Sequence, residues 1–339
     1  MKTVHNGKPL LELQDVKKYF PIEQGFLKKK VGYVKAVDEV NLTLYQGETL
    51  ALVGESGCGK TTLGRCILRV LEPTSGSILF RPDDEDIDLS VINKKRLRPL
   101  RRHMQMIFQD PFASLDPRMT VLDIVGEPPI ENGIARGKAL VERVGRLMTT
   151  VGLDVKHLNR FPHAFSGGQR QRIGIARALA PEPRLIVCDE PVSALDVSVQ
   201  AQILNLLLDL QAEYHLAYLF ISHDLAVVEH IADRVAVMYV GRIVELAAAP
   251  SLFKTPRHPY TEALLDAAPH PDPDHMPTGK GLTGEIANPA DPPSGCYFHP
   301  RCPYAEAICK TETPDWVEVD TGHFSACHFA RDLSLRGVD

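Results

Sequence analysis

The clearest candidate for chemistry in this sequence is a glycine-rich segment that matches the phosphate-binding pattern G-x-x-x-x-G-K-[ST]. Its glycines allow the backbone to curl, so that successive N–H groups point inward at phosphate oxygens. Lys60 would bridge the β and γ phosphates of a nucleoside triphosphate, and the Thr61 hydroxyl would ligate Mg²⁺. We therefore predict binding of a nucleoside triphosphate and Mg²⁺, and we assign no chemistry to Cys58. The predicted phosphate-binding residues are Gly54, Glu55, Ser56, Gly57, Cys58, Gly59, Lys60, Thr61 and Thr62.

A second candidate is the acidic pair Asp189-Glu190, which follows the apolar segment Leu185–Cys188. Burying two carboxylates at the end of a strand is costly unless a cation lies near them, and Mg²⁺ would supply that charge. Asp189 would hold the metal, usually through water, and Glu190 would polarise the attacking water as a general base. Two acids in an exposed turn are the alternative interpretation.

An α/β core has to position these residues. Hydrophobic periodicity predicts helices and strands in alternation, which indicates a largely parallel sheet. The predicted elements are a strand at Thr49–Val53, a helix from Lys60, a helix at Gly168–Leu179, strands at Leu185–Cys188 and Ala217–Ile221, a helix at Val197–Glu213 and a hairpin about Gly241. We also expect short β segments over 11–90, a solvated surface excursion over Asp83–Arg102 and mainly helices over 110–165.

Composition excludes several classes of protein. Lys and Arg number 38 against 43 Asp and Glu, and 44% of residues are hydrophobic, which excludes a disordered chain and a supercharged nucleic-acid binder. No uninterrupted apolar run exceeds six residues, so we expect no membrane span. The start, Met1–Phe20, lacks the apolar core of a signal peptide. We therefore expect a cytosolic protein with reduced thiols.

Four further motifs give the sequence its resemblance to the ATP-binding subunits of ABC transporters. The family signature is matched from Phe165, where the family usually has Leu, through Ser166, Gly167, Gly168, Gln169, Arg170 and Gln171 to Arg172. Gln109 matches the Q-loop, Asp196 in Ser193-Ala194-Leu195-Asp196 matches the D-loop, and His223 matches the switch histidine. The motifs follow one another in the family's order.

The resemblance implies an α/β fold: a P-loop NTPase core of ABC ATPase type, with an antiparallel β subdomain and a helical subdomain at about 110–165. The cassette would span 10–268. Two subunits would sandwich ATP, so that Ser166, Gly167, Gly168 and Gln169 of one complete the phosphate site of the other. His223 would contact the γ-phosphate and the attacking water, while Gln109 would sense Mg²⁺ and relay closure to a membrane partner. The helix start at the signature agrees with anion binding.

An aromatic side chain for stacking on adenine is expected in the first 35 residues of such a cassette. We select Phe20, with Tyr19 and Tyr33 as alternatives. All three could instead simply pack against their neighbours.

The segments Leu71–Gly76, Pro191–Ser198 and Arg257–Thr261 resemble those of dipeptide/oligopeptide permease ATPases. This implies an importer containing two such ATPases, identical or paralogous, two integral-membrane subunits and an external substrate-binding protein, without nucleic acid. The chain would lie peripherally on the cytoplasmic face of the membrane. Import of nickel or oligosaccharides is an alternative, as are a soluble ABC ATPase acting outside transport and an iron–sulfur-regulated ATP sensor.

The last part of the chain contains a Pro-rich linker, 269–293, and a small irregular extension, 294–330. Four cysteines crowd this extension: Cys296, Cys302, Cys309 and Cys327. They could be free thiols, bind zinc or ligate an iron–sulfur cluster, although the C-x2–4-C knuckles of zinc sites are absent. The resemblance to peptide-permease ATPases favours a structural [4Fe–4S] cluster.

Overall fold

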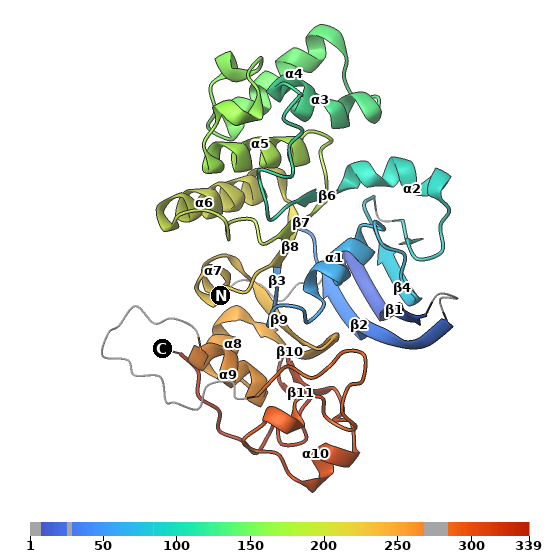
Figure 1. Cartoon of the computed structure of the whole chain (residues 1–339). Helices are drawn as coiled ribbons and strands as arrows, with labels where there is room; N and C mark the ends of the chain where they lie inside the picture. Colours follow the sequence, from blue (N-terminus) through green and yellow to red (C-terminus); the bar gives the residue numbers. More distant parts are fainter. Residues whose placement is uncertain (1–7, 26–28, 84, 268–283, 339) are drawn as a thin grey trace.

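The computed structural model describes residues 8–25, 29–83, 85–267 and 284–338. Two β-sheets form its frame, and helices cover them (Figure 1). The smaller sheet has four antiparallel strands in the order β2-β1-β4-β5, with bounds β1 Leu11–Gln24, β2 Lys29–Leu44, β4 Ser75–Phe80 and β5 Ile87–Asp88. The larger sheet has eight strands in the order β11-β12-β10-β9-β3-β8-β7-β6.

The strands at the centre of the larger sheet carry the candidate site. β9, β3, β8, β7 and β6 are parallel, and every residue of β3, β7 and β8 is buried. Such continuous apolar strands are typical of a parallel sheet that is covered on both faces. The bounds are β3 Thr49–Val53, β6 Met104–Ile107, β7 Leu185–Asp189, β8 Ala217–Ile221, β9 Arg234–Tyr239 and β10 Arg242–Ala248.

Ten α-helices lie in the described part of the chain. Three of them, α3, α4 and α5, gather beyond the β6 edge of the larger sheet (Figure 1). Their buried faces share one hydrophobic cluster with β7 and α6. The bounds are α1 Lys60–Ile67, α2 Lys94–Leu100, α3 Val121–Glu131, α4 Gly137–Thr150, α5 Gly167–Leu179, α6 Val197–Tyr214, α7 Leu225–Ile231, α8 Ala249–Lys254, α9 Pro259–Ala267 and α10 Ala307–Thr311.

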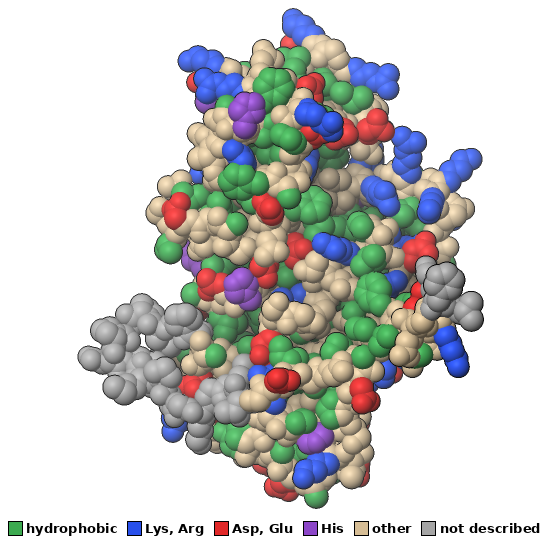
Figure 2. Space-filling view, viewed as in Figure 1, with side chains coloured by type: hydrophobic (Ala, Val, Ile, Leu, Met, Phe, Trp, Pro, Cys, Tyr) green, Lys and Arg blue, Asp and Glu red, His purple; other side chains and the backbone are tan. Residues whose placement is uncertain are grey.

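The first 102 residues differ from the sequence expectation in two respects. Instead of short segments, β1 and β2 are 14 and 16 residues long, because bulges along the pair let it bend and still continue. The segment Asp83–Arg102 is not simply a solvated excursion, since it contains β5 and α2 and buries Leu89 and Leu97. Its basic side chains do lie outside, over α2, as Figure 2 shows.

The extension is less irregular than predicted. Its strands β11 (Val317–Asp320) and β12 (His323–Ser325) continue the larger sheet, because β12 pairs with β10 through Glu245 opposite Ser325. Part of the predicted Pro-rich linker, 269–283, lies outside the described residues, and 284–293 contains no helix or strand. Within the described ranges, no helix has the length and apolar character needed to cross a bilayer.

Candidate active site

The predicted phosphate-binding segment forms the turn between β3 and α1. At Gly54 φ is +148°, and a Cβ there would lie 2.2 Å from the Met238 carbonyl oxygen. At Gly59 φ is +113°, and a Cβ would lie 2.0 Å from the Ala36 carbonyl oxygen. Both backbone positions therefore require glycine. The backbone of β9 packs against the Gly54 end of this turn and the backbone of β2 against the Gly59 end, which restricts the conformation of the turn.

Lys60 begins α1 and is 6% exposed. Its Nζ donates hydrogen bonds to the carbonyl oxygens of Gly54 at 2.6 Å and Glu55 at 2.9 Å, so the ammonium lies inside the turn. The first N–H groups of α1 and the positive end of its dipole lie at the same place. Lysine charge, helix start and curled backbone together form an arrangement suited to phosphate oxygens. Cys58 is buried here, and burial raises the pKa of its thiol.

Thr61 and Asp189 meet although 128 positions separate them. The Thr61 hydroxyl donates to Asp189 Oδ1 at 2.8 Å, because α1 starts beside the carboxyl end of β7. Burial raises the pKa of Asp189 above its usual range, and the Thr61 bond opposes that shift. Hydroxyl and carboxylate oxygens are the donors that Mg²⁺ accepts, so this pair fits the predicted metal.

Glu190 contacts two other predicted residues, and the three residues follow different strands. Gln109 Nε2 donates to Glu190 Oε2 at 2.7 Å, and His223 Nδ1 lies 3.0 Å from Glu190 Oε1. The backbone at Glu190 has φ +48°, a strained conformation for a side chain with a Cβ, and its N–H donates to the Ile221 carbonyl. This turn directs the carboxylate toward Gln109 and His223 at the carboxyl edge of the sheet.

The signature lies apart from this group. Ser166 caps α5: its Oγ accepts the Gln169 N–H, and the Gln169 side chain accepts the Ser166 N–H, which is a capping box. Ser166 is exposed, whereas Gly168 packs so tightly that a Cβ would lie 2.5 Å from Val199 Cγ1. Asp196 caps α6 by accepting the Val199 N–H. In the part of the chain that the structure describes, no hydrogen bond joins Ser166–Gln169 to the phosphate-binding turn.

The three aromatic candidates for adenine stacking lie on the β1–β2 hairpin. The Tyr19 hydroxyl donates a hydrogen bond to Asp38, and this bond fixes the position of the ring. Phe20 follows it on β1 and therefore projects from the opposite face, where Lys18 Nζ lies 5.0 Å from the ring centroid. Tyr33 on β2 is 47% exposed. Phe20 and Tyr33 have ring surface available, while Tyr19 is committed to an internal contact.

The four extension cysteines line one small cavity of about 20 Å³. Burial raises the pKa of Cys302 to about 12 and of Cys327 to about 11, and it also raises the pKa of Cys296. Four convergent thiols fit the donor set of an iron–sulfur cluster. Among the described residues, however, no group of three or more His, Cys, Asp or Glu is arranged to hold a metal ion. The predicted [4Fe–4S] cluster and its zinc alternative are therefore not confirmed.

Sequence reasoning missed two contacts between the C-terminal part of the chain and the phosphate-binding turn. Arg301 forms an ion pair with Glu55, with Nη1 2.7 Å from Oε2. The buried Tyr260 hydroxyl accepts the Glu55 N–H at 2.9 Å. Tyr260 belongs to the Arg257–Thr261 segment. The sequence marked this segment by its family resemblance but did not show which residue it contacts. Nothing in the sequence indicates the pairing of Arg301.

Comparisons with known proteins agree with this geometry. Residues 37–193 match the family model described as "ABC transporter", and residues 244–309 match the one described as "Oligopeptide/dipeptide transporter, C-terminal region". The chain is 51% identical over 335 residues to "Oligopeptide transport ATP-binding protein AppF" of Bacillus subtilis, which covers 96% of this chain and 99% of that protein. It is 52% identical over 319 residues to "Probable peptide ABC transporter ATP-binding protein y4tS" of Sinorhizobium fredii, covering 94% and 89%.

A solved structure is also similar in fold. It is described as "Dimeric structure of a post-hydrolysis state of the ATP-binding cassette MJ0796 bound to ADP and Pi". The TM-score is 0.62 at 28% sequence identity, and the match covers 70% of this chain and 98% of that one.

Proposed function

This chain belongs to the ABC transporter family, in the branch of oligopeptide and dipeptide transport ATP-binding proteins, and from that membership we propose that it powers the import of dipeptides or oligopeptides. It is an ATPase coupled to transmembrane transport. The match over 244–309 and the printed names of both relatives, which concern peptides, support peptides as the cargo.

One observation carries the proposal. Gln109 and His223 each contact one carboxylate oxygen of Glu190, and the Thr61–Asp189 pair lies directly beside them. A nucleotide whose phosphates lie in the turn at Lys60 would direct its γ-phosphate toward these side chains. Thr61 and Asp189 would hold Mg²⁺, which supplies charge that balances the phosphate oxygens. The remaining residues of the turn would bind through backbone N–H groups.

In the proposed reaction a water molecule attacks the γ-phosphorus, and the bond from that phosphorus to the bridging oxygen of ADP breaks. Glu190 accepts a proton from the attacking water, and the products are ADP and phosphate. His223 would contact the γ-phosphate and the water, and Gln109 would sense the metal and the water. Their contacts with Glu190 hold its carboxylate in the direction that this proton transfer requires.

We assign completion of the ATP site to a second ATPase subunit, identical or paralogous. The exposed Ser166 cap of α5, with Gly167, Gly168 and Gln169, is the surface that would reach the other subunit's γ-phosphate. The similar cassette MJ0796 is described as dimeric, which supports this arrangement. Asp196 caps the neighbouring helix and would lie in the same interface. ATP would close the pair, and hydrolysis would let it open.

Two integral-membrane subunits and an external substrate-binding protein complete the proposed importer, with this chain peripheral on the cytoplasmic face of the membrane. Phe20 is the proposed base-stacking residue, since Tyr19 is engaged with Asp38. The proposed units are the cassette 10–268 with its helical part at about 110–165, the linker 269–293 and the extension 294–330.

For the extension we propose a structural [4Fe–4S] cluster held by the four cysteines that line one cavity: Cys296, Cys302, Cys309 and Cys327. Its chemistry would be to cross-link these segments through iron–thiolate bonds. The test is metal analysis of protein purified without oxygen. About four irons per chain and a broad brown absorbance support the cluster. Stoichiometric zinc without iron, or no metal at all, contradicts it.

The transport proposal is tested by purifying the chain from membranes and reconstituting it with the proteins that accompany it. We expect two polytopic subunits to co-purify, and we expect ATP-dependent uptake of labelled dipeptides or oligopeptides into vesicles. The matched control is Lys60→Ala, which should assemble but not transport. Absence of membrane subunits refutes the role in transport, and uptake of nickel or oligosaccharides without peptides refutes the assigned cargo.

A further inference from the structure

The phosphate-binding turn has a neighbour that its motif does not describe. Arg301, in the 3₁₀ turn His299–Arg301 of the extension, contacts the Glu55 carboxylate with both Nη atoms, at 2.7 and 3.1 Å. The Arg301 side chain is 4% exposed and also lies over the rings of Tyr239 and Phe298. A two-bond contact between a buried guanidinium and a carboxylate fixes orientation as well as distance.

This contact reaches the ammonium group that would bind phosphate. Glu55 is held by Arg301 through its side chain and by Tyr260 through its N–H. The same residue's carbonyl oxygen accepts from Lys60 Nζ at 2.9 Å. A shift of Glu55 would therefore move both the backbone N–H groups of the turn and the position of Lys60. Arg301 acts on phosphate only through these residues.

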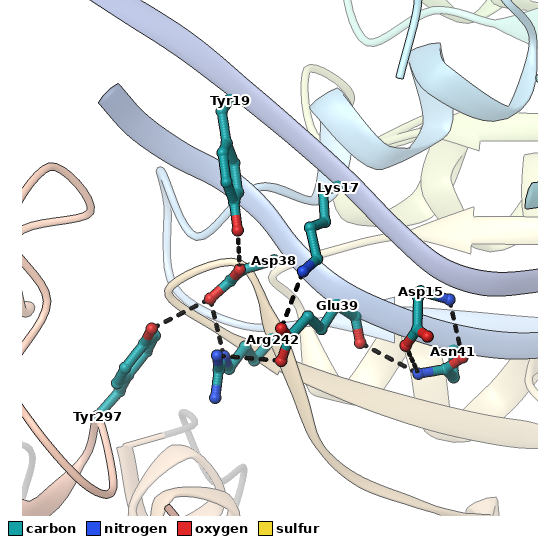
Figure 3. Close-up of polar contacts among 8 residues, drawn as sticks. All are labelled: Asp15, Lys17, Tyr19, Asp38, Glu39, Asn41, Arg242 and Tyr297. Atoms are coloured by element: carbon teal, nitrogen blue, oxygen red, sulfur yellow. Dashed lines mark hydrogen bonds and ion pairs between the residues drawn. The ribbon is translucent and has the colours of Figure 1, made fainter. Parts of the chain in front are cut away.

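A second contact from the extension reaches Asp38 of β2, the strand that pairs with the strand of the proposed base-stacking residue (Figure 3). Tyr297 donates its hydroxyl to Asp38 Oδ2 at 3.0 Å, beside Arg242 Nε at 2.9 Å on the same oxygen. The other carboxylate oxygen accepts the hydroxyl of Tyr19. Because Tyr19 precedes Phe20 on β1, Asp38 connects the extension to the place where adenine would stack.

Both contacting residues adjoin cysteines of the shared cavity. Tyr297 follows Cys296, and Arg301 precedes Cys302. The Cys296 N–H also donates to the Cys309 carbonyl at 2.9 Å, and a Cβ at Gly295 would lie 2.4 Å from that carbonyl oxygen. Hydrogen bonding and close packing thus fix the segment 295–302 at the cysteine cavity. Its Tyr297 and Arg301 side chains reach the residues around the proposed nucleotide site.

We propose that Arg301 and Tyr297 are positioning residues through which the four-cysteine extension sets the nucleotide affinity of its own chain. The inference rests on the proposed ATP site and adds a determinant of affinity outside the cassette motifs. Loss of the Arg301 contact leaves Glu55 without its cation, and the turn relaxes away from the shape that binds phosphate. A change at the four cysteines that line the cavity would alter nucleotide affinity through the same Arg301 and Tyr297 contacts.

The experiment measures ATP affinity of the full chain by calorimetry in EDTA, where hydrolysis does not interfere, and the KM and kcat for ATP with Mg²⁺. Arg301→Gln should weaken binding about tenfold and raise KM while kcat is kept, a change within the usual range of coupling between sites. The matched control, Arg331→Gln, removes an equal charge directly after the extension; in the described structure Arg331 donates one hydrogen bond, to the Glu318 carbonyl. Its affinity should equal that of the natural chain.

Further variants distinguish a specific effect on ATP binding from a general loss of folding. Glu55→Gln combined with Arg301→Gln removes both charges, so it should bind ATP more tightly than Arg301→Gln alone. Tyr297→Phe removes one hydroxyl and should weaken binding about threefold, the loss of roughly one hydrogen bond at modest strength. Cys302→Ser should weaken binding in the natural chain but add little in the Arg301→Gln background.

Unchanged affinity in both Arg301→Gln and Tyr297→Phe overturns the inference, as does full additivity of Cys302→Ser and Arg301→Gln. The proposed ATP site is judged separately with Lys60→Ala. If that variant binds ATP as well as the natural chain does, the ATP site itself is wrong. If Lys60→Ala loses binding while the Arg301 and Tyr297 variants keep it, only the role of the extension is refuted.

Discussion

Glu190→Gln offers the sharpest test of the proposed hydrolysis chemistry. Glutamine keeps the size of the side chain but cannot accept a proton from water. In the natural chain one carboxylate oxygen accepts from Gln109 Nε2 at 2.7 Å, and the other lies 3.0 Å from His223 Nδ1. The oxygen of a glutamine can still accept from Gln109, so at most the contact with His223 is lost. The site should keep its phosphate-binding turn, because the hydrogen bonds of the Lys60 and Thr61 side chains in the described structure go to Gly54, Glu55 and Asp189 rather than to Glu190.

The expected loss in kcat is that of a positioned general base, about 10²- to 10⁴-fold. ATP binding should remain within about threefold, since the lost contact is one hydrogen bond. Because ATP then persists, a complex of two subunits should accumulate with ATP. Phosphate release measures the rate, and size-exclusion chromatography with light scattering measures the complex.

The control for this measurement is Glu182→Gln, which makes the same chemical change at an exposed ion pair with Arg143. Its hydrolysis rate should equal that of the natural chain, because exposed pairs contribute little. If Glu190→Gln retains more than about a tenth of the natural rate, Glu190 is not the base. If it loses both hydrolysis and ATP binding, the arrangement around Glu190 serves binding, and the assigned chemistry is refuted.

Three further outcomes follow from the same structure. Lys60→Ala should abolish measurable ATP binding by calorimetry, because the turn loses its only described ammonium; binding at natural affinity contradicts the phosphate assignment. Gly59→Ala should lower the free energy of unfolding by about 1–3 kcal/mol or more, since φ there is +113° and the Cβ has no room; urea titration measures this, and an unchanged midpoint contradicts it. Asp38→Asn should remove a pH-dependent part of stability: burial raises the pKa of Asp38, but hydrogen bonds from Tyr19 and Arg242 outweigh burial and lower it. That stability is present above the unfolded pKa of about 4 and is lost as pH falls through the folded value, so the variant's unfolding midpoint should change less with acid than that of the natural chain.

Local sequence was sufficient where a motif encodes its own geometry. The turn from Gly54 to Thr61 and the helix start after Ser166 depend on residues within a few positions, and both lie where they were predicted. The Ser166 capping box was not predicted. Buried strands such as Leu185–Asp189 were also predictable, because continuous apolar runs bounded by turns leave few alternatives. The roles given to the side chains stay predictions.

Contacts across the fold were beyond the sequence. Arg301 and Glu55 are 246 positions apart, and each is an ordinary surface residue type until the fold brings them together. The length of β1 and β2 was missed because bulges interrupt the alternation that marks a strand. The extension was predicted as irregular because β12 has three residues, too few for periodicity to register, and its stability comes from pairing with β10.

That pairing determines where the chain can be cut. Removing everything after 283 would leave β10 as an open edge, whose free N–H and C=O groups could recruit a strand from another molecule. The buried Glu245 carboxylate would also lose His323, which lies 2.7 Å from it. We expect a shortened chain of this kind to aggregate, and we expect the cassette and its extension to unfold together in the full chain.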